Sequence, residues 1–487
     1  MKNIFSKNKK TNAPKLNRNI SRRDILKNGM SGAAAFSLRS MATGLPVGFL
    51  LSGAMPAYAA QAKDQKLILA MSDDGESINC YAPGTYSSDA SNALSTIERP
   101  TTAQLGTGVL GTINGNDVTA LDFSEMASFN LGDTQVDAAR YLSYLPEDLR
   151  ERLGFFHLRT AANGHPEGPN VHGVHGGLTA VNGRGVEEIQ SALMQEMQLN
   201  SLNHNSLLTT PMVLGNGRGL ATLKNEGIAI TRYSPLDIKN LFLGGEASVD
   251  LNNMKRLYEN TIDSMYRDIK QNGSTAQMNF LDAHALSRSQ AVILGEELGD
   301  LLSSITGETN TDQALASVGL IKANLAPVVV IRYAFSGDNH SDTDLSGEVA
   351  ASIEQTNAIV QLWDLLKTEN LQDDINFATY DIFGRTFGRN SEGGRDHHNS
   401  HCTNFMFGSN VKAGVVGGVE AWDNSGIRIA RASGINSTTG LMADADISLD
   451  ETLVAYCRTL MAMQGIPEER IAIRLPSSKT VYGALKS

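Results

Sequence analysis

The sequence predicts an α/β domain: a mostly parallel sheet with helices on both faces. Short apolar runs alternate with segments of helical periodicity, which is typical of parallel strands joined by helices. The clearest case is a strand at 326–335, an amphipathic helix at 343–371 and a strand at 376–382. A helical crossover between two strands is the pattern of a parallel βαβ unit.

The N-terminal segment, residues 1–60, is predicted to be an export signal and not part of the fold. The run Ser-Arg-Arg-Asp-Ile-Leu-Lys at 21–27 precedes a weakly apolar stretch at 30–55 and a small-x-small cleavage site at 57–59. This is the pattern of twin-arginine signals, so we expect the twin-arginine translocation machinery as a partner and a periplasmic or secreted product. Arg39 would cost about 2.5–3.5 kcal/mol at mid-bilayer, which argues against a stable membrane span.

The mature chain, 61–487, is predicted to form a single domain. Its first strand is the apolar run at 66–71, and a second follows at 153–158. Between them, residues 84–135 are rich in Ser, Thr, Gly and Asn and have weak periodicity, so we expect loops and short strands inserted over one face. Helical periodicity predicts helices at 185–199, 252–271 and 276–304. A short strand is predicted at 403–407.

Charge and cysteine content exclude some classes of function. The formal net charge of −11 argues against binding to a nucleic-acid backbone, which needs a basic surface. The three cysteines allow at most one disulfide, and their spacing matches neither a zinc knuckle nor a redox pair.

Acidic and histidine residues follow successive predicted strands. Because ligands of open parallel sheets bind beyond the carboxyl ends of the strands, we expect these side chains to meet at one edge. Carboxylates and neutral imidazoles bind divalent metals, so the sequence predicts a site for Zn, Ca, Mn or Mg. The candidate ligands are Asp73 and Asp74 after the first strand, Asp338 and His340 after the third, Asp381 at the end of the fourth, and Asp396 and His397 in the loop beyond it.

These candidates have a structural alternative. An aspartate at a strand end is commonly a turn or cap residue, so no single one of them indicates a metal. The run at 393–401 is the most specific, because it places three histidines and an aspartate close together after a glycine pair. Cys402, next in the chain, is interpreted as a small buried apolar residue rather than a ligand.

The same region resembles the DUF1501 family of secreted bacterial proteins. The resemblance rests on Phe-Gly-Arg-Thr at 383–386, Asn390, Gly-Gly at 393–394, Asp-His at 396–397, Phe-Gly at 407–408 and Val-Lys-Ala-Gly at 411–414. Gly-Asp-Asn-His at 337–340 is similar to a further family segment, and Asp74-Gly75 with Asn79 resembles its first turn. This family is considered a distant relative of the sulfatase and alkaline phosphatase superfamily.

The resemblance implies a metal-ligand set by position. It comprises Asp73 or Asp74, Asp338 with His340, Asp381, and His397. The chain departs from the family at Ile382, where a glutamate is usual; the acid lies one residue earlier, and in a regular strand that shift turns the side chain to the other face. No superfamily nucleophile is evident. Thr160 is the best positional candidate, with a turn threonine as the alternative.

The function predicted from these features is metal-dependent hydrolysis of sulfate or phosphate esters, with a small anionic ester as substrate. Arg385 would bind the ester bidentately or, alternatively, pair with a neighbouring carboxylate. The shifted acid and the missing nucleophile favour a second hypothesis, a non-catalytic exported binding or assembly protein on the same fold. A third, suggested only by the export route, is a redox or cofactor protein.

Overall fold

The computed structural model describes most of the chain after the predicted signal segment. The described residues are 65–72, 74–76, 78–89, 91–167, 171, 212–215, 224–225, 228–229, 232–243, 298–323, 326–333, 337–422 and 426–486. The signal segment 1–60 and the helices predicted at 185–199 and 252–271 lie outside these ranges. Of the helix predicted at 276–304, the described part is helical over 298–303. In the described ranges, no helix is both long and apolar enough to cross a bilayer.

An eight-stranded sheet forms the centre of the molecule, in the order β10-β7-β11-β1-β12-β15-β6-β16. Five of its strand pairs are parallel, and only the two pairs made by β15 are antiparallel. A mostly parallel α/β sheet is therefore confirmed. Its strands are β1 (Lys66–Met71), β6 (Leu153–Leu158), β7 (Met212–Leu214), β10 (Arg232–Tyr233), β11 (Val328–Arg332), β12 (Ile375–Tyr380), β15 (Cys402–Phe407) and β16 (Gly414–Val416).

The strands predicted at 66–71 and 153–158 have the bounds that the sequence indicated. The predicted βαβ unit is also present, as β11, the helix α12 (Ser346–Thr368) and β12, with β1 inserted between the two strands. The observed β11 and α12 are shorter at both ends than the predicted 326–335 and 343–371. The strand predicted at 376–382 ends at Tyr380.

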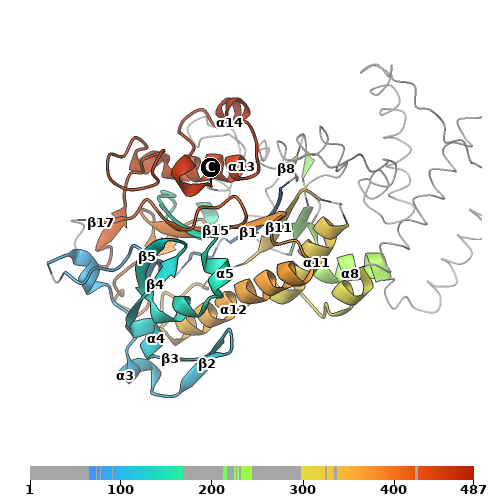
Figure 1. Cartoon of the computed structure of the whole chain (residues 1–487). Helices are drawn as coiled ribbons and strands as arrows, with labels where there is room; N and C mark the ends of the chain where they lie inside the picture. Colours follow the sequence, from blue (N-terminus) through green and yellow to red (C-terminus); the bar gives the residue numbers. More distant parts are fainter. Residues whose placement is uncertain are drawn as a thin grey trace, which may run out of the picture.

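Helices cover both faces of the sheet, as Figure 1 shows. The helices α11 (Asn310–Lys322) and α12 pack on one face against side chains such as Phe377 and Phe405. The helix α13 (Thr452–Met463) packs on the other face, where Phe156 and Tyr456 lie 4.9 Å apart between ring centroids. Residues next to each other in a strand point to opposite faces, so a strand that is buried throughout, such as β1, contributes side chains to the cores on both faces.

Most remaining elements are short and lie around the central sheet. Two hairpins stand outside it between the first two long strands; the first lies within the segment 84–135, and the second extends beyond it to Ala139. The hairpins are β2 (Val109–Ile113) with β3 (Asn116–Thr119) and β4 (Met126–Leu131) with β5 (Thr134–Ala139); the others are β8 (Lys224–Asn225) with β9 (Ile228–Ala229), β13 (Gly384–Arg385) with β14 (His397–His398), and β17 (Val419–Ala421) with β18 (Ala430–Ala432). The short helices are α3 (Thr102–Leu105), α4 (Leu121–Ser124), α5 (Glu147–Arg150), α8 (Pro235–Leu243) and α14 (Glu468–Arg474).

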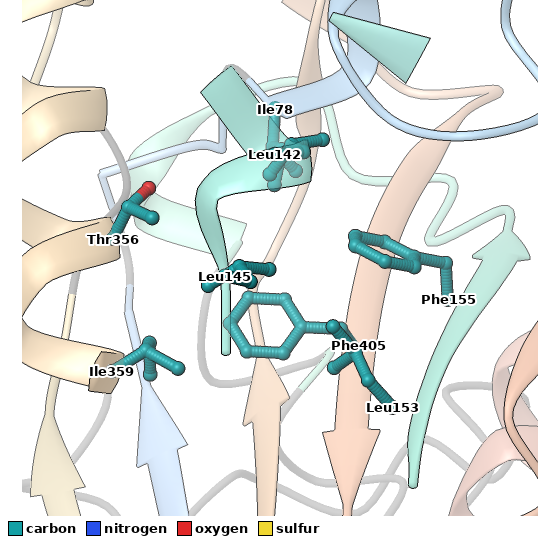
Figure 2. A pocket seen from close by; sticks show the side chains of 8 residues that line it. All are labelled: Ile78, Leu142, Leu145, Leu153, Phe155, Thr356, Ile359 and Phe405. Carbon is teal, nitrogen blue, oxygen red and sulfur yellow. The ribbon is translucent and has the colours of Figure 1, made fainter. Parts of the chain in front are cut away.

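A small cavity of about 20 Å³ lies between α12 and the sheet. Figure 2 shows Thr356 and Ile359 of α12 on one side of it and Phe155 and Phe405 of the strands on the other. A void of this volume holds at most one water, and one lined by apolar groups stays dry. We interpret it as a packing defect in the core and not as a ligand site.

Candidate metal centre

Four connecting segments meet at one edge of the sheet. Strands β1, β11, β12 and β6 all run in the same direction, so their carboxyl ends lie at the same edge. Strand β15 runs in the opposite direction, and the loop that precedes it therefore reaches this edge as well. These segments begin after Met71, Leu158, Arg332 and Tyr380. The last of them ends before Cys402, the first residue of β15.

Three of these loops bring histidines and an aspartate together. His165, Asp338 and His397 each offer a ligand atom within 4.8 Å of the others'. His165 Nε2 lies 3.6 Å from Asp338 Oδ2, and His340 Nε2 lies 3.2 Å from Asp338 Oδ1. His340 Nε2 also lies 3.1 Å from His397 Nε2. We call these four residues the histidine cluster.

The outer ring nitrogens of the cluster have fixed partners. His340 Nδ1 lies 2.8 Å from Asp396 Oδ1, which also accepts a hydrogen bond from Asn390. His397 Nδ1 lies 2.7 Å from the carbonyl oxygen of Asn163. Burial opposes ionisation of Asp396, but the hydrogen bonds from Asn390 and His340 hold its pKa below the usual range. Asp396, predicted as a metal ligand, is thus placed behind His340.

The glycine pair at 393–394 allows this close approach. A Cβ on Gly394 would lie 2.0 Å from the carbonyl oxygen of Asn339, and Gly393 has a φ of +85°. Only glycine lets the backbone of this loop pack directly on residues 339–340. On the opposite side, Ala161 has a φ of 62°, an uncommon conformation for alanine, in the loop that carries His165.

Phe383 and Arg385 lie directly beside the cluster. The ring of Phe383 is 4.1 Å from that of His397 and 5.2 Å from that of His165, between centroids. Arg385 has no exposed side-chain surface, and its guanidinium donates to Asp338 and to the carbonyls of Asp74 and Gly337. These contacts make Arg385 a residue that positions Asp338 rather than one that faces solvent. This corresponds to the carboxylate-pairing alternative.

The candidates after β1 are not part of the cluster. Asp73 lies outside the described residues. The Asp74 carboxylate is 2.7 Å from Arg332 Nη2 and forms an ion pair with it. Asp74 is therefore paired with Arg332 and does not belong to the histidine cluster.

Asp381 is also separate from the cluster. It follows the last residue of β12, so the face expected from regular strand alternation does not apply. Its Oδ1 accepts hydrogen bonds from the backbone N–H groups of Gly75 and Ile382, and the residue is 3% exposed. Burial raises the pKa of Asp381 to about 7, and burial together with Asp381 raises that of Glu76. The side chain of Ile382 lies in the core.

We predict that Asp381→Asn is more stable, relative to wild type, at neutral pH than at acidic pH. Between the unfolded pKa near 4 and the folded value of about 7, the native state keeps a proton that the unfolded state has lost, so stability falls as pH rises. The difference in the free energy of unfolding between the variant and wild type should therefore grow by about 2 kcal/mol between about pH 5.5 and about pH 7. Urea unfolding across this range measures it, and a difference that does not change with pH would contradict the prediction.

The remaining predicted residues are buried beside the edge. Thr160 is 8% exposed, and its hydroxyl has no hydrogen-bond partner among the described residues. The two histidines that follow His397 lie in the interior: His398 Nε2 is 2.8 Å from the carbonyl of Ala430, and His401 Nε2 is 2.8 Å from His157 Nδ1. Cys402 is a buried free thiol, as expected.

His165 is the residue that sequence reasoning missed as a ligand. No local pattern indicates that the strand before it pairs with β15. A histidine seven residues after an apolar strand was the available signal. Its place in the histidine cluster follows from β6 running parallel to β12 at the same edge.

Larger surface grooves in the described part of the chain lie elsewhere. Two of them, of about 360 and 450 Å³, share Gly132 and Glu151 near the β4–β5 turn. Neither is lined by a residue of the histidine cluster. Their size alone does not relate them to the chemistry at the sheet edge.

Comparison with known proteins finds a family model that matches part of the chain. Residues 247–448 match the model described as "Protein of unknown function (DUF1501)", a range that includes Asp338, His340 and His397 but not His165. No curated protein matches the chain. Among solved structures, "Crystal structure of Ps i-CgsB in complex with k-i-k-neocarrahexaose" is similar at 10% identity over 86% of this chain and 75% of that one, with a TM-score of 0.33. "Crystal structure of Ps i-CgsB" has 11% identity, the same coverage and a TM-score of 0.32.

Proposed function

We propose that the chain, of which residues 247–448 match the DUF1501 family model, is an exported metal-dependent hydrolase that acts on sulfate or phosphate esters. The observation that carries this proposal is the convergence of His165, Asp338 and His397 from three separate loops at one sheet edge. The twin-arginine pattern at 21–27 supports export through the twin-arginine machinery to the periplasm or beyond.

The residue types in the cluster fit a divalent cation. Imidazole nitrogens and a carboxylate are metal ligands, and the histidines are supported by outer hydrogen bonds of the kind that orient such ligands. Burial lowers the pKa of His397 to about 4, so this ring is neutral near pH 7 and retains a lone pair. A divalent cation here would supply Lewis-acid polarisation of an ester oxygen.

The chain's own residues support access and orientation. The side chain of Asp338 is 56% exposed, so an ester can approach the cluster from solvent. Arg385 holds Asp338 through its Nη1 atom, 3.4 Å from Oδ1. The buried Phe383 ring packs against the ring of His397, 4.1 Å away between centroids.

The alternative is a non-catalytic exported binding or assembly protein with the same cluster. Specific observations favour it: Arg385 is buried and already paired with Asp338, and the hydroxyl of Thr160, the candidate nucleophile, is buried. On this alternative the cluster binds a metal but no ester is cleaved.

Turnover of aryl phosphate and aryl sulfate esters by the full exported protein, across several divalent metals, tests the two functions. If the protein is a hydrolase, we expect turnover that Asp338→Asn reduces by at least about 100-fold, the scale on which one electrostatic group acts in catalysis. The control Glu392→Gln alters an exposed acid in the neighbouring loop and should retain activity. Metal binding without turnover of either ester class would favour the binding protein.

A further inference from the structure

The hydrogen bonds of the cluster determine which nitrogens face inward. Asp396 offers a carboxylate oxygen to His340 Nδ1, and Asn163 offers a carbonyl oxygen to His397 Nδ1. Both oxygens can only accept hydrogen bonds, so each Nδ1 carries a hydrogen. On a neutral ring this leaves the lone pair on Nε2. The Nε2 atoms of both rings point toward each other at 3.1 Å.

Two facing lone pairs repel unless something positive lies between them. The space beside the two Nε2 atoms is completed by Asp338, whose Oδ1 lies 3.2 Å from His340 Nε2. The arrangement is therefore explained either by a cation shared among these atoms or by a proton on His340.

Three of the separations within the histidine cluster are compatible with a shared metal ion, and ligand atoms of His165, Asp338 and His397 all lie within 4.8 Å of one another. Two ligand atoms about 2.1 Å from one centre lie at most about 4.2 Å apart. The three measured separations, between Nε2 of His340 and His397, between His340 and Asp338, and between His165 and Asp338, are 3.1, 3.2 and 3.6 Å. Each lies under this limit.

We propose that the histidine cluster binds a borderline transition-metal ion, zinc or a close chemical equivalent, through Nε2 of His165, His340 and His397 and a carboxylate oxygen of Asp338. The assignment rests on the proposed metal site and deepens it by naming the cation class. Imidazole-rich sites suit zinc, copper, iron and nickel, whereas magnesium, calcium and manganese prefer oxygen ligands. With three imidazoles and one carboxylate, the cluster has too few oxygens for calcium, which takes six to eight.

The proposal also assigns positioning roles to residues outside the cluster. Asp396 orients His340, and Asn390 in turn donates to Asp396 Oδ1 and to the carbonyl of His340. Outer hydrogen bonds of this type fix the tautomer of a metal-binding histidine, and their loss typically weakens metal binding 10- to 100-fold. We therefore expect Asp396→Asn to weaken binding on this scale while leaving the ligands in place.

Cobalt titration of the full exported protein, first stripped with a chelator, tests the assignment. Co²⁺ in a nitrogen-rich site gives visible ligand-field absorption, and we expect these bands to appear and to be displaced by stoichiometric Zn²⁺ but not by excess Ca²⁺ or Mg²⁺. His340→Gln and His397→Gln should each lose at least about 10-fold in Co²⁺ affinity. The control His398→Gln replaces the neighbouring histidine, which bonds to Ala430 instead, and should keep the bands.

Two outcomes would overturn the assignment. The first is the absence of Co²⁺ bands in the wild-type protein, which would mean that a proton on His340 explains the geometry. The second is displacement of Co²⁺ by Ca²⁺ or Mg²⁺ at comparable concentrations. Neither readout depends on turnover: bands without ester cleavage would contradict the hydrolase and leave the zinc assignment intact, whereas cleavage supported only by Mg²⁺ or Ca²⁺ would do the reverse.

Discussion

Glu348→Ala is expected to destabilise the protein by about 3–5 kcal/mol, because it leaves a buried guanidinium without its counter-charge. Glu348 lies in the first turn of α12, and its Oε2 is 2.7 Å from Arg395 Nε; neither side chain is exposed. The same carboxylate accepts hydrogen bonds from Tyr81 at 2.6 Å and Asn339 at 2.9 Å. One substitution therefore breaks three buried interactions.

The pair also connects two loops of the histidine cluster. Asn339 precedes His340, and Arg395 precedes Asp396. Because both donate hydrogen bonds to Glu348, this carboxylate connects the two loops. Arg395 further donates to the carbonyls of Thr386 and Phe387. We therefore expect the milder Glu348→Gln, which keeps the shape of the side chain, to weaken metal binding as well as stability.

Urea unfolding measures the effect of Glu348→Ala. The matched control is Glu354→Ala on the exposed side of the same helix, which should change the free energy of unfolding by no more than about 0.5 kcal/mol. A double variant, Glu348→Leu with Arg395→Met, should lose less than the sum of its single changes, because no unpaired charge remains. A loss below about 1 kcal/mol for Glu348→Ala would contradict this account of the network.

Zinc is expected to stabilise the folded protein by about 4 kcal/mol when its free concentration is 1,000 times the dissociation constant. A cation that binds only the folded state shifts the unfolding equilibrium by mass action, and the three loops of the cluster come together only on folding. Thermal or urea unfolding with Zn²⁺ and with a chelator measures the difference. A bound metal ion also places a positive charge beside the Asp338 carboxylate. Without the metal, this carboxylate is paired with Arg385.

The histidine variants separate a specific effect from a general one. His397→Ala should abolish most of the zinc-dependent increase in stability. His398→Ala, in the same short strand β14, should lower stability without zinc, because it removes a buried hydrogen bond to Ala430, but it should keep the increase. An equal zinc effect in wild type and His397→Ala would show that the metal acts at another place.

The predictions that depended on local pattern agree with the structure. The strands at 66–71 and 153–158 were predicted with their observed bounds, since a compact apolar run between polar turns leaves little freedom for a strand's ends. The βαβ unit was predicted because β-branched strands and helical periodicity alternate along the chain. Its ends were not, because helix and strand limits depend on hydrogen bonds to distant residues, such as those that end β12 at Tyr380.

For the candidate site, the sequence indicated His340 and His397 from residue type and position after predicted strands, and the glycine pair from its place before the histidines. It did not separate Asp338 from Asp74 and Asp381, since all three are acids at strand ends. Tertiary contacts separate them: Asp74 pairs with Arg332, and Asp381 is enclosed by the backbone of Gly75 and Ile382.

By itself, the sequence determined the α/β class, the order of the main elements and the collection of acids and histidines at strand ends, because these follow from periodicity and residue chemistry within short windows. Only the tertiary structure decided that β15 runs antiparallel and brings β6 alongside it, which adds His165 to the cluster. It likewise decided that Arg385 is buried against Asp338. Strand order and side-chain burial depend on contacts between residues far apart in the chain, and no local pattern encodes which of those contacts form.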